Sequence, residues 1–193
     1  MINHIDVSVV LRGTVCDLYS NLVTRPTGAA VRAEIEQQLA ELGGRTLTII
    51  DFTHVGLLDF SCADEIVAKL LLKYCDRADG ARARVDDARA EGYFVFRGIN
   101  DSHLDAIEAV LEHHGLALVA ERGDDGAQLV GTVGDAERRA WETVHQLGAA
   151  DPEELADAAG MSPDDAMRLL ETLCRRRLLM RLDDTYVPVG IRR

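Results

Sequence analysis

The chain has 193 residues, of which 47% are hydrophobic and 28% are charged, a composition typical of a folded globular protein rather than a disordered one. The formal net charge is −12, with −9 on residues 1–134 and −3 on residues 135–193. Because contacts to nucleic-acid phosphates need an excess of basic side chains, this charge disfavours nucleic acid as the main partner.

The four cysteines form neither a CxxC pair nor a metal-ligand spacing with histidine, so we expect reduced thiols and a cytoplasmic protein. The first residues, MINHIDVSVV, lack the basic and apolar regions of a signal peptide. The sequence shows no apolar run near the ~20 residues of a membrane span, and no glycine-rich phosphate loop. We therefore expect no membrane segment, no metal and no cofactor.

The first part of the chain predicts two strands, a helix and a third strand. Residues 7–12 are rich in Val and Leu, and residues 14–20 are expected to pair with them in a hairpin that turns at Gly13. Thr27 is expected to cap a helix whose apolar residues recur at helical spacing. The apolar, β-branched residues 46–51 predict a strand that is covered on both faces.

From Ser61 to Tyr74 the hydrophobic pattern becomes that of an amphipathic helix. The charged residues 76–92 are interpreted as a solvated connection. Residues 93–97 and 116–120 are predicted to form strands, with a helix over residues 104–114 between them. Residues 128–130 are predicted to add a short edge strand. Apolar strands separated by helices predict right-handed βαβ units and an α/β fold. The sheet should be largely parallel, and the N-terminal hairpin would make it mixed.

A turn-rich stretch near Gly134 marks a predicted boundary between two domains, residues 1–134 and 135–193. Beyond it the alternation of strand and helix stops. Three short helices and a β-hairpin are predicted over residues 140–147, 152–160, 163–173 and 180–188. This order of elements resembles that of a winged helix-turn-helix domain, and the resemblance rests on the order alone.

The segment TIIDFTHVGLLDFSCADEIVAKLL resembles the central motif of STAS domains, the anti-sigma-factor antagonist fold, and FRGINDSHLDAIEAVLEHHGLALVA resembles the strand, helix and strand that follow it. The step Ala63-Asp64-Glu65 is most similar to divergent STAS-like domains. The resemblance covers roughly residues 1–121. It implies a non-catalytic regulatory module whose partner is a histidine-kinase-like ATPase or an anti-sigma-type protein.

In antagonists of this family the phosphorylated serine directly follows the motif aspartate. Asp59 matches that aspartate, but Phe60 occupies the position of the phosphorylated serine. The resemblance therefore does not imply regulation by phosphorylation at this position. Ser61, with Asp64 three residues later, is predicted to form a capping box, and a displaced phosphorylation site at Ser61 is the alternative. Phe60 is expected to point its ring into the junction between the sheet and the helix. Cys62 is expected to be a small buried residue that faces the sheet, with a reactive thiol as the alternative.

The resemblance also implies that this helix and the loop before it contact the regulatory partner. We expect the charged residues of the helix, including Lys73, to lie on its exposed side, where a plain solvated face is the alternative reading. Arg25 and Arg32 are expected to form surface salt bridges, with pairing to Asp59 or anion binding as alternatives. The predicted partner-binding residues are Asp59, Phe60, Ser61, Asp64, Glu65, Lys69 and Leu72.

The C-terminal domain offers a second hypothesis, a transcription regulator that binds DNA through Arg168, Arg175 and Arg176. Aspartates stand at the start of the third helix and at the presumed wing tip, Asp183-Asp184, where they would repel phosphates. We therefore expect this domain to contact protein or to form a homodimer. A small enzyme or ligand sensor that uses Ser61 or Cys62 is the third hypothesis, and no base–nucleophile pair supports it.

Overall fold

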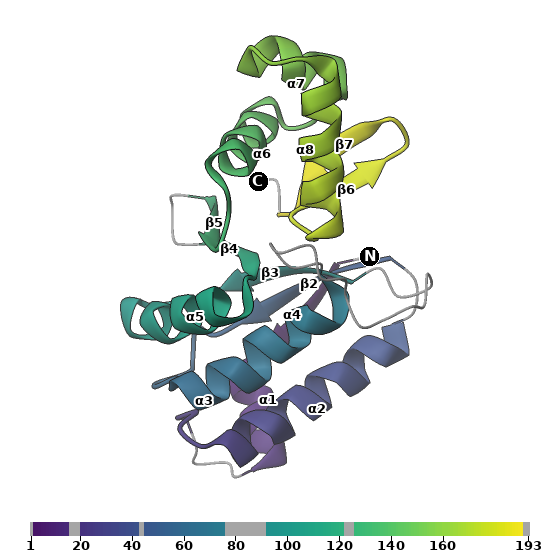
Figure 1. Ribbon diagram of the computed structural model, residues 1–193. Helices are drawn as coiled ribbons and strands as arrows, with labels where there is room; N and C mark the ends of the chain where they lie inside the picture. The colour runs from purple at the N-terminus through teal and green to yellow at the C-terminus, as the bar shows by residue number, and fades with distance from the viewer. Residues whose placement is uncertain (1, 16–19, 43–44, 76–91, 122–125, 191–193) are drawn as a thin grey trace.

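The computed structural model describes residues 2–15, 20–42, 45–75, 92–121 and 126–190. It is an α/β structure built on a five-stranded mixed sheet, which has helices on one face and a C-terminal group of helices and a hairpin on the other (Figure 1). Within these residues, no helix has the length and apolar character required to cross a membrane.

The strands follow one another across the sheet in chain order. β1 (Ile2–Asp6), β2 (Thr46–Asp51), β3 (Gly92–Arg97) and β4 (Ala117–Glu121) run parallel, and β5 (Ala127–Gly131) runs antiparallel to β4. The mixed character therefore comes from β5, and the predicted N-terminal hairpin does not form. The short apolar runs over β2, β3 and β4 confirm the predicted strands, since each is buried on both faces.

The prediction of a strand over residues 7–12 is wrong, because this segment is helical. Asp6 caps the helix by accepting hydrogen bonds from the backbone N–H groups of Ser8 and Val9. Val7, Val10 and Leu11 are buried at helical spacing, whereas Val9 is exposed. Residues 16–19 of the second predicted strand lie outside the described residues.

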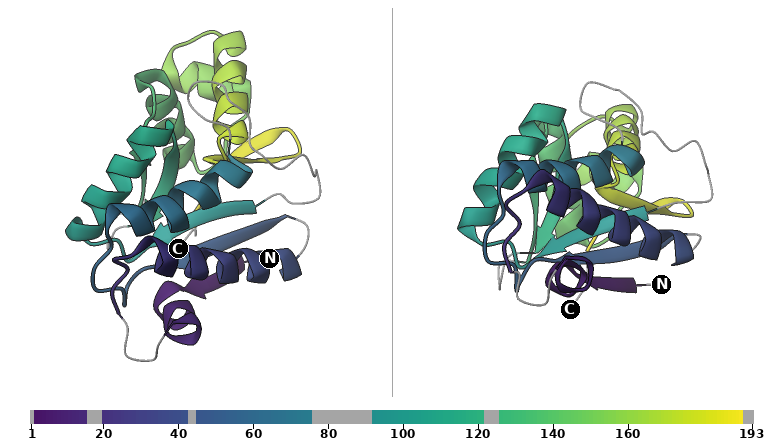
Figure 2. Two further views of the ribbon diagram at one scale, coloured as in Figure 1. Left: turned by 60° about the horizontal axis from the view of Figure 1, so that its bottom comes forward. Right: turned by 90° about the horizontal axis from the view of Figure 1, so that it is seen from below.

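One continuous helix, formed by α3, η1 and α4, lies between α2 and α5 on the first face of the sheet (Figure 2). Thr27 lies inside α2, which begins at Arg25, so Thr27 is not its cap. The elements on this face are α1 (Val7–Thr14), α2 (Arg25–Leu42), α3 (Phe60–Ala63), the π-helical turn η1 (Asp64–Ala68), α4 (Lys69–Tyr74) and α5 (Asp101–His114).

The C-terminal group contains the three helices and the hairpin that the sequence predicts. Its hydrophobic side chains form one cluster with Leu47, Tyr93 and Val95 on the second face of the sheet. The described residues of the second predicted domain, 135–190, therefore share a core with the strands of the first. The elements are α6 (Asp135–Leu147), α7 (Pro152–Ala159), α8 (Pro163–Arg175), β6 (Leu179–Leu182) and β7 (Thr185–Pro188).

Polar contacts reinforce this shared core. Arg177 donates from its guanidinium to the Tyr93 hydroxyl at 3.2 Å and to the Tyr74 carbonyl at 3.3 Å. The indole N–H of Trp141 donates to the Leu178 carbonyl at 3.1 Å in the buried interior. Arg45, just before β2, donates to the Arg181 carbonyl at 2.9 Å. The bonds of Arg177 and Arg45 join the C-terminal group to the sheet and to the end of α4, and the bond of Trp141 lies within the C-terminal group itself.

Because the core is shared, the substitution Val95→Ala on the sheet should destabilise the C-terminal group together with the sheet. We expect a loss of about 2 kcal/mol in the free energy of unfolding. In urea, the fluorescence of Trp141, the chain's one tryptophan, and the far-UV circular dichroism should show the same midpoint. Val9→Ala, at a 57% exposed position, is the matched control and should change little. Separate midpoints for the two signals would contradict the shared core.

Candidate functional site

The helix α3–η1–α4 is capped by Asp59, not by Ser61. The Asp59 carboxylate accepts hydrogen bonds from the Cys62 backbone N–H at 2.8 Å and from the Ser61 hydroxyl at 2.9 Å. Burial raises the pKa of Asp59, but these hydrogen bonds outweigh burial and hold the pKa below its ordinary value. The predicted capping box between Ser61 and Asp64 is therefore wrong, because the cap lies two residues earlier, at Asp59, and Asp64 faces other partners.

Cys62 is buried as predicted, but its thiol faces the start of α2 rather than the sheet. The thiol donates to the Thr24 carbonyl, with the sulfur 3.0 Å from the oxygen. Burial, together with the charge of Asp59, raises the pKa of Cys62 to about 11, which disfavours the thiolate that a reactive cysteine needs. The helices approach closely here, since a Cβ on Gly28 would lie 3.0 Å from the Cys62 Cα.

Asp64 and Glu65, which the sequence places on the exposed side of the helix, are buried with only 7% and 3% of their surfaces exposed. The helix has neighbours on both sides, so its flanks are covered as well as the face on the sheet. Both residues belong to the π-helical turn η1, a wider and rarer turn than the α-helix.

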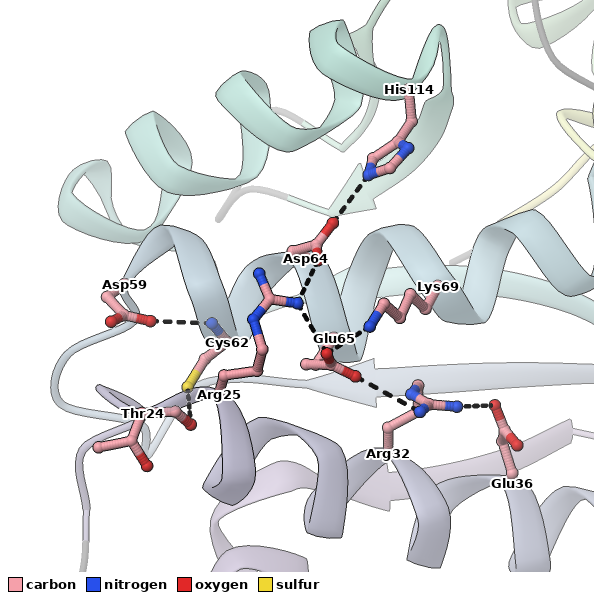
Figure 3. A network of polar contacts seen from close by, with 10 residues as sticks. All are labelled: Thr24, Arg25, Arg32, Glu36, Asp59, Cys62, Asp64, Glu65, Lys69 and His114. Atoms are coloured by element: carbon pink, nitrogen blue, oxygen red, sulfur yellow. Dashed lines mark hydrogen bonds and ion pairs between the residues drawn. The ribbon is translucent and has the colours of Figure 1, made fainter.

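An arginine bridges the two carboxylates (Figure 3). One guanidinium nitrogen of Arg25, Nη1, lies 2.8 Å from both Asp64 Oδ2 and Glu65 Oε1. Asp64 Oδ1 lies 2.7 Å from Nε2 of His114, at the end of α5. Arg25 therefore does not pair with Asp59, and its salt bridges reach buried rather than surface carboxylates.

Glu65 also pairs with Arg32 and Lys69. Arg32 Nη2 lies 3.4 Å from Glu65 Oε2, while Nη1 of the same guanidinium lies 2.9 Å from Glu36 Oε1. Lys69, one helical turn after Glu65, forms an ion pair with Glu65 Oε1, as its i,i+4 spacing predicts. Each oxygen of the Asp64 and Glu65 carboxylates thus has a basic partner.

These partners set the ionisation of the two carboxyl groups. Burial raises the pKa of Asp64, but hydrogen bonds from His114 and Arg25 outweigh it and lower the pKa. In the same way, hydrogen bonds from Lys69 and Arg25 outweigh the effect of burial on the pKa of Glu65 and lower it. Both groups therefore carry their charge at neutral pH.

Three exposed apolar residues, here named the loop patch, lie at the start of this helix and on the two segments next to it: Val23, Leu57 and Phe60. Their exposed fractions are 43%, 53% and 46%. Their segments are joined by backbone hydrogen bonds, from Leu22 N–H to the Leu57 carbonyl at 2.8 Å and from Asp59 N–H to the Leu22 carbonyl at 2.9 Å. The loop patch therefore stands on a fixed backbone.

Phe60 does not point into the junction between sheet and helix, because it is the first residue of α3 and lies at its outer end. Its ring meets the edge of the His113 ring, with centroids 6.5 Å apart. Leu72, predicted to be exposed, is half-buried against the core of the first face.

Sequence reasoning missed Arg25, Arg32 and His114 as partners of the carboxylates. The spacing of seven residues between the two arginines, which puts them on one helical face, is the signal that points to them.

The residues of the DNA-binding alternative are used differently. Arg168 is exposed and pairs with Asp165. Arg175 is exposed at the end of α8, where it donates to the Thr172 hydroxyl at 3.1 Å. Arg176 is buried and bonds to Glu137 and to the Thr132 carbonyl, so its guanidinium is not presented to a phosphate backbone.

Compared with protein-family models, with curated proteins and with solved structures, the chain shows no significant match to any of them. Among the described residues, no group of three or more His, Cys, Asp or Glu side chains is arranged to hold a metal ion. What the site offers is a fixed array of charges beside an exposed apolar surface, an arrangement suited to binding.

Replacing the cap should show which residue begins the helix. Asp59→Ala should lower the free energy of unfolding by about 1 kcal/mol, because it removes the acceptor for the Cys62 N–H, whereas Asp59→Asn should retain most of the stability. Ser61→Ala should cost less than Asp59→Ala, since it removes only a hydroxyl donor. Urea unfolding followed by circular dichroism measures all three variants. A larger loss for Ser61→Ala would restore Ser61 as the cap.

The carboxylates Asp64 and Glu65 should make stability depend on acid pH. Their pKa values in the folded chain lie below the ordinary values of 3.8 and 4.5, so the unfolded chain binds more protons as the pH falls. Their contribution is complete above about pH 5 and is lost as the pH falls through the folded-state pKa values. Glu65→Gln should lower stability at pH 7 by about 3 kcal/mol, and should make stability fall less steeply between about pH 5 and 3.

Glu112→Gln, at an exposed position on the neighbouring helix, is the control and should stay within about 0.5 kcal/mol of the parent chain at each pH. The measurement is the urea midpoint at a series of pH values. An unchanged pH slope in Glu65→Gln would show that the carboxylate is not held by its basic neighbours.

Proposed function

We propose that this chain is a non-catalytic, cytoplasmic regulatory module that binds a protein partner through the loop patch. The observation that carries the proposal is the exposure of Val23, Leu57 and Phe60 on two segments held together by backbone hydrogen bonds. Exposed apolar side chains gathered on a rigid base are typical of protein interaction sites, and aromatic residues serve as anchors there.

The base beneath the loop patch supports this function. Gly56 N–H donates to the Ser20 carbonyl at 2.7 Å, and Leu57 N–H donates to the Asn21 side chain at 3.2 Å. His103, fully buried, has its Nε2 3.2 Å from the Gly56 carbonyl oxygen. A surface that is already ordered loses less conformational entropy on binding, which favours affinity.

The kind of partner follows from the STAS-like resemblance. The residues that carry that resemblance form β2, the loop before α3, the helix α3–η1–α4, and then β3, α5 and β4. A STAS-like module of this kind would dock a histidine-kinase-like ATPase or an anti-sigma-type protein. Asp59 and Ser61 lie beside the loop patch and would form the polar rim of the interface. Asp64, Glu65 and Lys69 lie further along the helix and would act indirectly, through the ion pairs that hold the helix against α2 and α5.

The winged-helix-like group of residues 135–193 is proposed to support the sheet rather than to bind DNA. Arg176 and Arg177, the two basic residues that follow α8, are engaged with Glu137 and with Tyr93. Aspartates at positions 164 and 165 begin α8, where a recognition helix would meet the major groove. DNA binding through Arg168 and Arg175 stays the alternative, and homodimerisation remains compatible with the exposed faces.

The double variant Leu57→Ser/Phe60→Ser should test this function. We expect its affinity for the partner to fall at least tenfold, because both apolar anchors are removed, with little change in thermal stability. The partner is captured from the native cytoplasm with the full chain, purified, and titrated by calorimetry.

The matched control is Val9→Ser/Leu147→Ser, which removes equally exposed apolar residues elsewhere, 57% and 53% exposed. An equal loss in the control, or none in the double variant, would contradict docking through the loop patch. If the captured partner is neither an ATPase nor an anti-sigma-type protein, the partner class is wrong. Salt-dependent binding of duplex DNA in an anisotropy titration would instead favour the alternative.

A further inference from the structure

A pocket opens along the far half of the same helix, away from the loop patch. It has a volume of about 550 Å³. Three helices contribute to it, α2, α3–η1–α4 and α5, and its lining residues are Arg32, Glu36, Asp64, Lys69, Leu72, Lys73 and His114. We propose that this pocket binds a small phosphate-bearing anion, which Arg32, Lys69 and Lys73 would hold.

The hydrogen-bonding groups of the pocket favour an acceptor as ligand. Nε of Arg32 is buried and has no hydrogen-bond partner among the described residues. The ammonium groups of Lys69 and Lys73 each carry three N–H donors. Among the described residues, Lys73 makes a long contact of 3.4 Å with Glu36 and lies 5.9 Å from the centre of the Tyr74 ring, which leaves N–H donors for a ligand. Unused donors, one of them buried, are costly unless an acceptor meets them.

The acceptors of the pocket, in contrast, are already engaged. Both oxygens of Glu65 and both of Asp64 meet basic groups, as described above, and both oxygens of Glu36 meet Arg32 and Lys73. A cation entering the pocket would therefore find its carboxylates occupied and would face three basic side chains. An anion would find donors that converge from two helices.

The distribution of charge points the same way. The chain carries −12 overall and contains two lysines, Lys69 and Lys73, both of which line this pocket. Together with Arg25 and Arg32 they outnumber the three carboxylates of the cluster. A local excess of positive charge on an acidic protein concentrates anions at that place.

The pocket is open to ligands from solution. The side chains of Lys69 and Lys73 are each 39% exposed, so their ammonium groups can reach a bound phosphate without unfolding. Leu72 adds an apolar side chain to the lining of the pocket, suited to the organic part of a phosphomonoester. Free phosphate and a phosphomonoester share the chemistry that the basic groups recognise, and contact with Leu72 distinguishes the two.

The test uses the full chain labelled with ¹³C-lysine. Because the sequence has two lysines, a ¹H–¹³C spectrum shows two ε-CH₂ signals, which Lys69→Arg and Lys73→Arg assign. Titration with inorganic phosphate at constant ionic strength should shift both signals saturably. Phenyl phosphate binding more tightly than phosphate would assign an organic phosphomonoester, and equal affinity would assign the free anion.

Lys73→Gln should weaken phosphate binding at least tenfold, because it removes a charged donor, and Lys73→Arg should restore most of it. Arg168→Gln, on the C-terminal group, is the control and should bind phosphate as the parent chain does. Shifts that stay linear with concentration, or that chloride reproduces at the same ionic strength, would overturn the proposal. This outcome does not bear on the loop patch, which shares no residue with the pocket.

Discussion

Two adjacent carboxylates, Asp64 and Glu65, are buried in a helix whose other inward residues are apolar, and the arrangement of the first face depends on them. A buried charge without a partner costs several kcal/mol, so each carboxylate has to be met by a basic group. Lys69 comes from the same helix, but the other groups come from α2 and α5, elements that lie far from η1 along the chain. The ion cluster therefore fixes how three helices lie against one another.

The same constraint explains a glycine. Arg25 and Arg32 reach the carboxylates only if α2 approaches the capped end of α3 closely, and at Gly28 a Cβ would lie only 3.0 Å from the Cys62 Cα. A side chain there would meet both the Cys62 backbone and Glu65, so the separation of the helices and the geometry of the ion pairs are set together. Local backbone shape and long-range electrostatics are in this way coupled through one position.

Much of the fold follows from hydrophobic pattern. The sequence predicts the buried strands β2, β3 and β4 and the helix α5 with its glycine cap. In each of these segments the spacing of the apolar residues fits either a strand or a helix, but not both. The N-terminal segment is not predictable in this way, since Val7 to Leu11 has the composition of a strand and its helical stripe contains only three buried apolar residues. There the Asp6 cap and burial of the stripe outweigh β propensity.

The candidate site was predictable in position but not in burial. The apolar stripe through Ile66 and Leu70 identifies one inward face of its helix, and a single helix gives no information about neighbours on its flanks. Because α2 and α5 cover those flanks, Asp64 and Glu65 are buried although they stand outside the stripe. Their burial becomes predictable only when Arg25 and Arg32, on another helix, are recognised as partners of these two carboxylates.

The two lysines have a chemical consequence for the chain as a whole. Primary side-chain amines are the targets of acylation, and here both stand on one helix, where Lys69 pairs with the buried Glu65. Acylating Lys69 would remove a positive charge that Glu65 needs, and would leave Arg25 and Arg32 to compensate that carboxylate alone. Acylation of side-chain amines in this acidic protein is therefore confined to the helix that carries the buried carboxylates Asp64 and Glu65.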